Sequence, residues 1–229
     1  MRILERLPRE SGRDYALRVL KDNIVHLDLA PGSQISENEL AAEMGLSRTP
    51  VREALIELSR VRIVEIYPQK KSTVALIDYA MVDEARFMRN QMECAVAELV
   101  CELATETDIA RLRECIRMQR FNLESYYSDS LMELDNRFHE TLFQIARKQE
   151  VYRLMQGIAI HFDRVRGMAL DTVKNHRIVA DHEMIVSTIG SRNKSAARAL
   201  MEQHLNRYRI DEAGIRARYP QYFAEKKQA

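Results

Sequence analysis

The chain has 229 residues, of which 46% are hydrophobic and 30% are charged, and its formal net charge is +1. This length suits two domains that each bury a core, and the scarcity of Gly and Pro favours helices over long disordered tracts. The near-neutral charge excludes a uniformly basic nucleic-acid binder, so any such role must rest on local clusters of Lys and Arg.

Membrane-spanning and export segments are not expected. No stretch approaches the ~18 uninterrupted apolar residues of a membrane helix, and the N-terminus MRILERLPRE lacks the apolar run of a signal peptide. Three cysteines without a CxxC pair argue against a disulfide framework and for a reducing compartment. We therefore expect a cytoplasmic protein that does not bind a membrane.

The N-terminal part of the chain predicts a helix-turn-helix. Residues 11–28 carry apolar side chains at helical spacing and predict an amphipathic helix. The sequence SENE at 36–39 is a capping box that opens a second helix, and Gly45 stands where a helix C-cap prefers glycine. The next predicted helix, 47–60, follows a short turn and begins with polar residues, which places it in the recognition position.

The helix predicted at 47–60 has two chemically different faces. One face is an apolar stripe that must meet a core, made of Val51, Leu55 and Leu58. Arg48 and Arg52 lie on another face, and either Ser47 or Thr49 can cap the helix. The first turn therefore offers free N–H groups, a hydroxyl and two guanidiniums, which suit a phosphate or a base edge.

A winged hairpin is predicted after this helix. Two short β-prone runs, at 63–67 and 73–76, flank a loop that contains Lys70 and Lys71. Between residues 48 and 71 the chain has six Lys or Arg against three Asp or Glu. The basic character is therefore local to the recognition helix and the wing.

Helical periodicity dominates from residue 78 onward. We expect helices near residues 80–104, 107–128, 130–147, 150–170, 174–190 and 193–212, followed by a charged tail. The predicted fold class is mainly α, with a winged helix-turn-helix domain over residues 1–77 and an all-helical domain over residues 78–229. The linker between them is short, which favours mechanical coupling.

Four side chains of the helical part have the residue types of a metal site. Asp135 and His139 are four residues apart, so they emerge on one helix face. His182 and His204 lie on later amphipathic helices whose apolar neighbours turn them inward. Three neutral imidazoles and a carboxylate suit Zn²⁺, and also Ni²⁺ or Mn²⁺.

Two alternatives stand beside a metal-binding sensor. One is a metal-dependent hydrolase or lyase with Glu140 or Glu183 as the general base, although no nucleophile elbow, phosphate loop or catalytic carboxylate pair supports it. The other is that the histidines are structural and a ligand binds without metal. His161 and His176 have no partner at ligand spacing, although His176 could line the cavity of the proposed metal site.

Taken together, these motifs resemble the GntR family of bacterial transcription regulators, and within it the FadR subfamily with an all-helical FCD effector domain. LAPGSQISENELAAEMGLSRTPVREALIEL is similar to the winged-helix pattern of the family. FMRNQMECAVAELV resembles the first FCD helix, with the Arg-x-x-apolar-Glu signature at Arg89 and Glu93, and DNRFHETLF resembles the Asp-x-x-x-His helix. His182 and His204 are 22 residues apart, which agrees with the spacing of the family's remaining two metal ligands. Six effector-domain helices rather than seven resemble the shorter, VanR-like branch.

The resemblance implies a homodimer that binds a near-palindromic double-stranded DNA operator. The residues expected at the DNA are Asn38, Ser47, Arg48, Thr49, Arg52, Lys70 and Lys71. Arg48 and Arg52 are the expected base readers, and Asn38 occupies a place where some relatives carry another DNA-contacting Arg. Arg62 and Gln69 stand where relatives usually have glycine around the wing, so we expect a reshaped wing whose lysines attract phosphates.

The resemblance also implies a sensor in the helical domain. Asp135, His139, His182 and His204 would bind a divalent metal, most simply zinc, with positions left open. Arg89 would reach an effector, with Arg86 and His176 as further effector-binding candidates. An open-sided metal beside a guanidinium is complementary to a small carboxylate, such as a hydroxy acid or a sugar acid.

Overall fold

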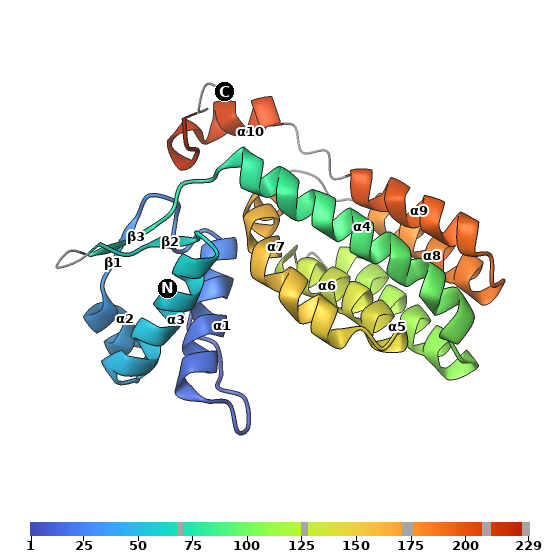
Figure 1. Cartoon of the computed structure of the whole chain (residues 1–229), viewed down its shortest axis with the longest axis horizontal. Coiled ribbons are helices and arrows are strands. Elements are labelled where there is room, and N and C mark those ends of the chain that lie inside the picture. The colour runs from blue at the N-terminus through green and yellow to red at the C-terminus, as the bar shows by residue number, and fades with distance from the viewer. Residues whose placement is uncertain (68–70, 125–127, 171–175, 208–211, 226–229) are drawn as a thin grey trace. The chain divides into compact units, whose positions relative to one another are not determined.

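The computed structural model describes residues 1–67, 71–124, 128–170, 176–207 and 212–225. Helices make up most of these residues, which confirms the mainly α fold class (Figure 1). The chain divides into two units. The first contains Met1–Asp83, Ile160–Val165 and Asp211–Ala229, and the second contains Glu84–Ala159 and Arg166–Ile210.

The first unit has the predicted winged helix-turn-helix. Its helices in the N-terminal part are α1 (Gly12–Val25), α2 (Glu37–Met44) and α3 (Arg48–Arg60). Its strands are β1 (Gln34–Ile35), β2 (Val64–Glu65) and β3 (Ser72–Val74), which pair antiparallel in the order β1-β3-β2. The wing strands are shorter than the predicted runs. A strand at β1 was not expected, because two residues are too short to show an alternating pattern.

Local sequence explains where α2 and α3 begin and end. The Ser36 hydroxyl accepts a hydrogen bond from the Glu39 N–H at 3.5 Å, and Gly45 ends α2 in the left-handed conformation with φ of 65°. Ser47 is the N-cap residue of α3, although its side chain makes no cap hydrogen bond. The apolar stripe of α3 is completely buried, at Val51, Ala54, Leu55 and Leu58. Burial of this stripe fixes which face of α3 remains free for other contacts.

The turn before the wing keeps a conformation that glycine favours. Arg62 has a φ of 59°, in the left-handed region, although its side chain has a Cβ. Strand β2 follows directly, with Val64 opposite Val74 of β3. The expected reshaping is therefore not needed at Arg62, while Gln69 and Lys70 lie outside the described residues.

The C-terminal segment is more ordered than the expected charged tail. It forms α10 (Glu212–Arg218) and a 3₁₀ turn (Pro220–Tyr222). Phe223 then forms a parallel bridge with Ile77, and its ring stacks on Tyr79 with centroids 5.4 Å apart. These contacts place the segment in the first unit, so that unit extends beyond the expected division at residues 77 and 78.

The second unit is a bundle of the predicted helices (Figure 1). They are α4 (Tyr79–Leu103), α5 (Glu106–Glu124), α6 (Ser128–Ile145), α7 (Gln149–Leu170), α8 (His176–Gly190) and α9 (Lys194–Arg207). The first turn of α4 and residues Ile160–Val165 of α7 belong to the first unit. Packing of α5 against α6 and α8, and of α8 against α9, encloses one apolar core. Within the described ranges, no helix is long and apolar enough to span a bilayer.

Candidate functional site

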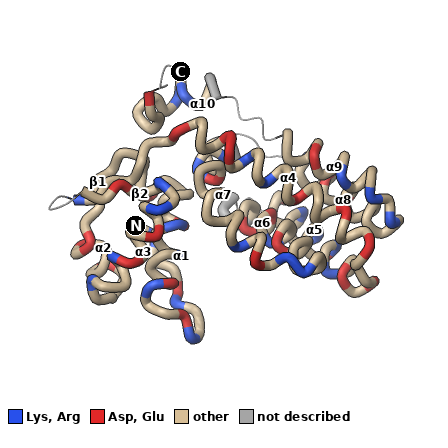
Figure 2. The backbone as a smooth tube through the Cα atoms, in the orientation of Figure 1, with Lys and Arg blue, Asp and Glu red and all other residues tan. Residues whose placement is uncertain are grey.

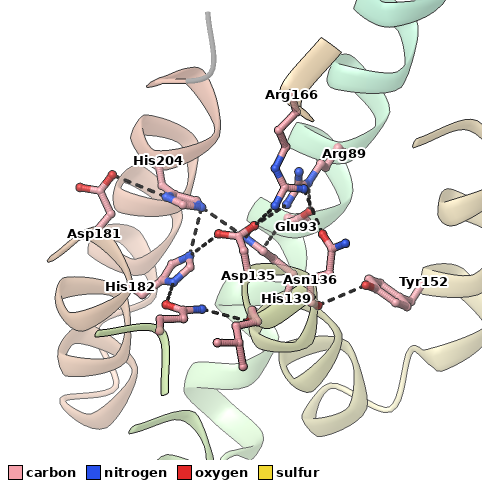
Figure 3. Close-up of polar contacts among 12 residues, drawn as sticks. Arg89, Glu93, Asp135, Asn136, His139, Tyr152, Arg166, Asp181, His182 and His204 are labelled. Atoms are coloured by element: carbon pink, nitrogen blue, oxygen red, sulfur yellow. Dashed lines mark hydrogen bonds and ion pairs between the residues drawn. The ribbon is translucent and has the colours of Figure 1, made fainter. Parts of the chain in front are cut away.

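Three helices of the second unit bring four ligand-type side chains to one buried point (Figure 3). Asp135 and His139 come from α6, His182 from α8 and His204 from α9. One ligand atom of each residue lies within 4.8 Å of the others, and every one of these side chains is buried. The structure thus brings together all four residues that the sequence proposes as metal ligands.

The ring nitrogens of the three histidines converge on one another. Nε2 of His204 lies 3.2 Å from Nε2 of His182 and 3.2 Å from Nε2 of His139. Two neutral rings that both present a bare Nε2 at this distance repel, unless a proton or a cation lies between them. Oδ1 of Asp135 lies 3.5 Å from His182 Nε2, is buried and accepts no hydrogen bond from the described residues. A set of three nitrogens and one unpaired oxygen fits a divalent metal.

The charges around the cluster favour its metal-binding protonation states. Burial lowers the pKa of His182 well below its ordinary value, and the nearby His204 lowers it further. Burial likewise lowers the pKa of His204, although Asp181 opposes this. For Asp135, burial alone would raise the pKa, but the charge of Arg166 helps to hold it far below the usual range. Neutral imidazoles and an ionised carboxylate are the forms that a metal requires.

A buried arginine that the sequence did not point to completes the cluster. Arg166 of α7 is fully buried, and its Nη2 donates to Oδ2 of Asp135 at 2.6 Å while its Nη1 donates to Oδ1 of Asn136 at 3.0 Å (Figure 3). Oδ2 of Asp135 is thereby bound to a guanidinium, and Oδ1 faces the histidines. Arg166 meets Asp135 and Asn136 only because α7 packs against α6, so no residue spacing in the sequence could have revealed this contact.

Of the three expected effector residues, Arg89 lies beside the cluster. Its Nε donates to Oε1 of Glu93 at 2.5 Å, and its Nη2 is 3.8 Å from Oδ2 of Asp135. Burial would raise the pKa of Glu93, but Arg89 and His139 lower it to about 2. Arg86 is half-buried one turn earlier on α4, and His176 begins α8 with a side chain outside the described residues.

The candidate general bases lie elsewhere. Glu140 is exposed and accepts a hydrogen bond from Gln144, and Glu183 pairs with Arg120 at the surface. His161 is buried in the first unit, where its Nε2 donates to the Val61 carbonyl at 2.7 Å. Neither glutamate is placed to activate water at the histidine cluster, and His161 has a structural partner.

The exposed face of α3 carries the residues expected at DNA. Ser47, Arg48, Thr49 and Arg52 are largely exposed at the start of this helix. Arg48, Arg52, Asn38 and Lys71 line a hollow of about 530 Å³ between α2, α3 and the wing. Lys70, which was expected to act with Lys71, lies outside the described residues.

Acidic side chains hold two of these cations. Arg48 Nη2 lies 3.3 Å from a Glu37 carboxylate oxygen, and Lys71 Nζ lies 3.2 Å from Glu39. The charged residues of α2 are all acidic, whereas α3 carries both Arg and Glu (Figure 2). The surface is therefore not uniformly basic, and carboxylates of α2 lie beside Arg48 and Lys71.

Comparison with known proteins agrees with both parts of the chain. Residues 16–74 match the model for bacterial regulatory proteins of the gntR family, and residues 84–207 match the FCD domain. The HTH-type transcriptional repressor RspR of Escherichia coli K12 is 33% identical over 219 residues, covering 95% of this chain and 96% of that protein. An uncharacterized HTH-type regulator from an unstable DNA locus of Streptomyces ambofaciens is 34% identical over 218 residues, covering 94% of this chain and 91% of its own length.

Solved structures share the fold. E. coli McbR/YncC has a TM-score of 0.78 at 19% identity, covering 93% of this chain and 99% of that chain. A putative GntR regulator from Rhodococcus sp. RHA1 has a TM-score of 0.70 at 20% identity, covering 94% of this chain and 100% of that chain.

A winged helix-turn-helix joined to an all-helical FCD domain defines a transcription regulator and not an enzyme. This chain belongs to the GntR family of bacterial regulators, in the group that carries an FCD domain.

Proposed function

We propose that the protein is a homodimeric repressor whose operator affinity changes when a small carboxylate binds at a divalent metal in the FCD domain. The observation that carries this proposal is the convergence of Asp135 and three histidines beside the buried Arg89. The relative RspR is named a repressor, which favours repression over activation.

The DNA side of the proposal rests on α3. Arg48 and Arg52 are four residues apart on the exposed face, so both guanidiniums can enter one major groove. A bidentate contact from arginine to guanine contributes roughly 1–3 kcal/mol of discrimination. Ser47, Thr49, Asn38 and the wing lysines would then contact the backbone or neighbouring bases. A homodimer would place two recognition helices about one helical turn apart on a near-palindromic site.

The sensor side rests on the residues of the cluster. Asp135, His139, His182 and His204 would hold the metal, with Zn²⁺ favoured by the nitrogen-rich set and Ni²⁺ or Mn²⁺ compatible with it. When bound, the metal would supply a Lewis-acidic centre for an oxygen of the effector. Arg89 reaches to within 3.8 Å of Asp135, so its guanidinium can also attract an effector carboxylate, such as that of a hydroxy acid or a sugar acid.

Helix α7 offers a route by which binding could reach the DNA-binding part. Residues Ile160–Val165 of this helix belong to the first unit, and Arg166, which binds Asp135, belongs to the second. An effector that favours one dimer conformation shifts the population of conformations. Couplings of about 1–3 kcal/mol would change operator affinity ~5- to 150-fold.

The test begins with operator fragments selected from genomic DNA by the purified protein. Gel shifts are then run with a panel of small hydroxy acids and sugar acids, each with and without a chelator. The proposal expects at least one acid to change operator affinity, and expects the chelator to abolish that change. An acid whose effect survives chelation would instead indicate that the effector binds in a metal-free pocket. Failure to select any operator fragment would contradict sequence-specific operator binding.

A further inference from the structure

Each histidine of the cluster has a second ring nitrogen that faces a polar side chain (Figure 3). Nδ1 of His182 faces Gln119 of α5, Nδ1 of His139 pairs with Glu93 of α4, and Nδ1 of His204 lies 3.5 Å from Asp181 of α8. We propose that Gln119, Glu93 and Asp181 are positioning residues, which fix the three rings with Nδ1 protonated and the Nε2 lone pairs directed into the cluster. This inference rests on the proposed metal site.

Gln119 carries the clearest evidence because its amide can be oriented. Its Nε2 donates to the Leu134 carbonyl at 3.0 Å, so its Oε1 is the atom that lies 2.8 Å from Nδ1 of His182. An amide oxygen can only accept, so Nδ1 of His182 must carry the proton. Nε2 of a neutral His182 is then bare, which is the form that binds a metal.

The position of Gln119 also couples two of the ligands. Gln119 is completely buried, and Leu134, whose carbonyl it binds, directly precedes Asp135. One side chain of α5 therefore holds a ring of α8 and the backbone of α6 next to another ligand. Its loss would loosen both ligands without removing either one.

Glu93 acts on His139 in a different way. Arg89 donates to Oε1 of Glu93, and the other oxygen, Oε2, pairs with Nδ1 of His139. A carboxylate beside Nδ1 favours the proton on that nitrogen and also raises the basicity of the ring, whereas the neutral amide of Gln119 only orients it. Asp181 has the same chemistry as Glu93 but lies farther from its ring, so we expect its substitution to have the smallest effect.

The test compares Zn²⁺ affinities by competition with a chromophoric chelator. Gln119→Met keeps the side-chain length but removes the acceptor, and should weaken Zn²⁺ binding about 10–100-fold. Gln119→Glu restores an acceptor oxygen and should recover much of that loss. Gln91→Met, at an exposed glutamine of α4, is the matched control and should bind like the wild type. A folded Gln119→Met protein with wild-type affinity would overturn the proposal.

A second measurement needs no bound metal. Long-range ¹H–¹⁵N spectra of the histidine rings in the metal-free wild type report which nitrogen carries the proton. We expect His182 to be protonated at Nδ1 with Nε2 bare, and an Nε2-protonated His182 would overturn the inference. Absence of Zn²⁺ binding to the wild type would instead contradict the proposed metal sensor, so the two failures are distinguishable.

Discussion

His161 should make the stability of the first unit depend on pH. Its ring is buried, Nε2 donates to the Val61 carbonyl, and Nδ1 lies 3.4 Å from Nη2 of Arg164. Arg164 can only donate, so Nδ1 must be the accepting nitrogen and the ring is neutral. Burial lowers the pKa of His161 to about 4, and the charge of Arg164 acts in the same direction.

The magnitude follows from linkage. An unfolded histidine has a pKa of about 6.5, so between about pH 6.5 and pH 4 the unfolded chain binds the extra proton and the folded chain does not. The stabilisation from the neutral ring is therefore fully present above about pH 6.5 and is lost as the pH falls. The loss amounts to about 2 kcal/mol at pH 5 and to about 3 kcal/mol at still lower pH.

The assay is urea unfolding of wild type and His161→Gln at pH 7.5 and pH 5. Glutamine keeps a donor near Val61 but does not titrate. The free energy of unfolding of the wild type, relative to that of the variant, should therefore fall by about 2 kcal/mol between pH 7.5 and pH 5. His26→Gln is a control of opposite sign, because a hydrogen bond to Asp22 raises the pKa of His26. The stabilisation from His26 is present below the unfolded pKa and is lost as the pH rises. A difference in free energy of unfolding between wild type and His161→Gln that is the same at both pH values would refute this reasoning.

Further predictions concern DNA binding, backbone strain and metal binding. Arg52→Ala should weaken operator binding about 10- to 100-fold and affect nonspecific duplex far less, and equal losses in gel shifts would exclude base reading. Arg62→Gly should raise the free energy of unfolding by about 1 kcal/mol, because it relieves a left-handed φ; an unchanged or lower urea midpoint would contradict this. Burial lowers the pKa values of His182 and His204, so metal affinity should hold through the ordinary imidazole range and decline only at lower pH. Competition titrations in which the affinity already falls steeply above about pH 6.5 would contradict this.

Much of the fold could be predicted because its signals are local. The capping box at Ser36 and the glycine at Gly45 fix the ends of α2, and apolar periodicity locates the long helices of the second unit. The two-residue strand β1 and helix α10 were not predicted. Strand β1 exists only through its pairing with β3, and the C-terminal segment is ordered by contacts with Ile77 and Tyr79, which are remote in sequence.

The candidate site divides in the same way. The four-residue spacing of Asp135 and His139 indicates a shared helix face, and the apolar neighbours of His182 and His204 turn these two residues inward. The family resemblance then agreed with their spacing. Arg166 and Gln119 were not found, because their partners lie on other helices and only tertiary packing brings them together. The sequence signal for each was a polar residue on the inward face of an amphipathic helix. That signal predicts a buried polar contact but does not identify the partner.

The most direct test of the central claim is elemental analysis of protein purified without a His tag. The wild type should carry about one divalent transition metal per chain, and a folded His182→Ala variant should carry far less. A wild type without metal, or equal metal content in the two proteins, would contradict a sensor built on the histidine cluster.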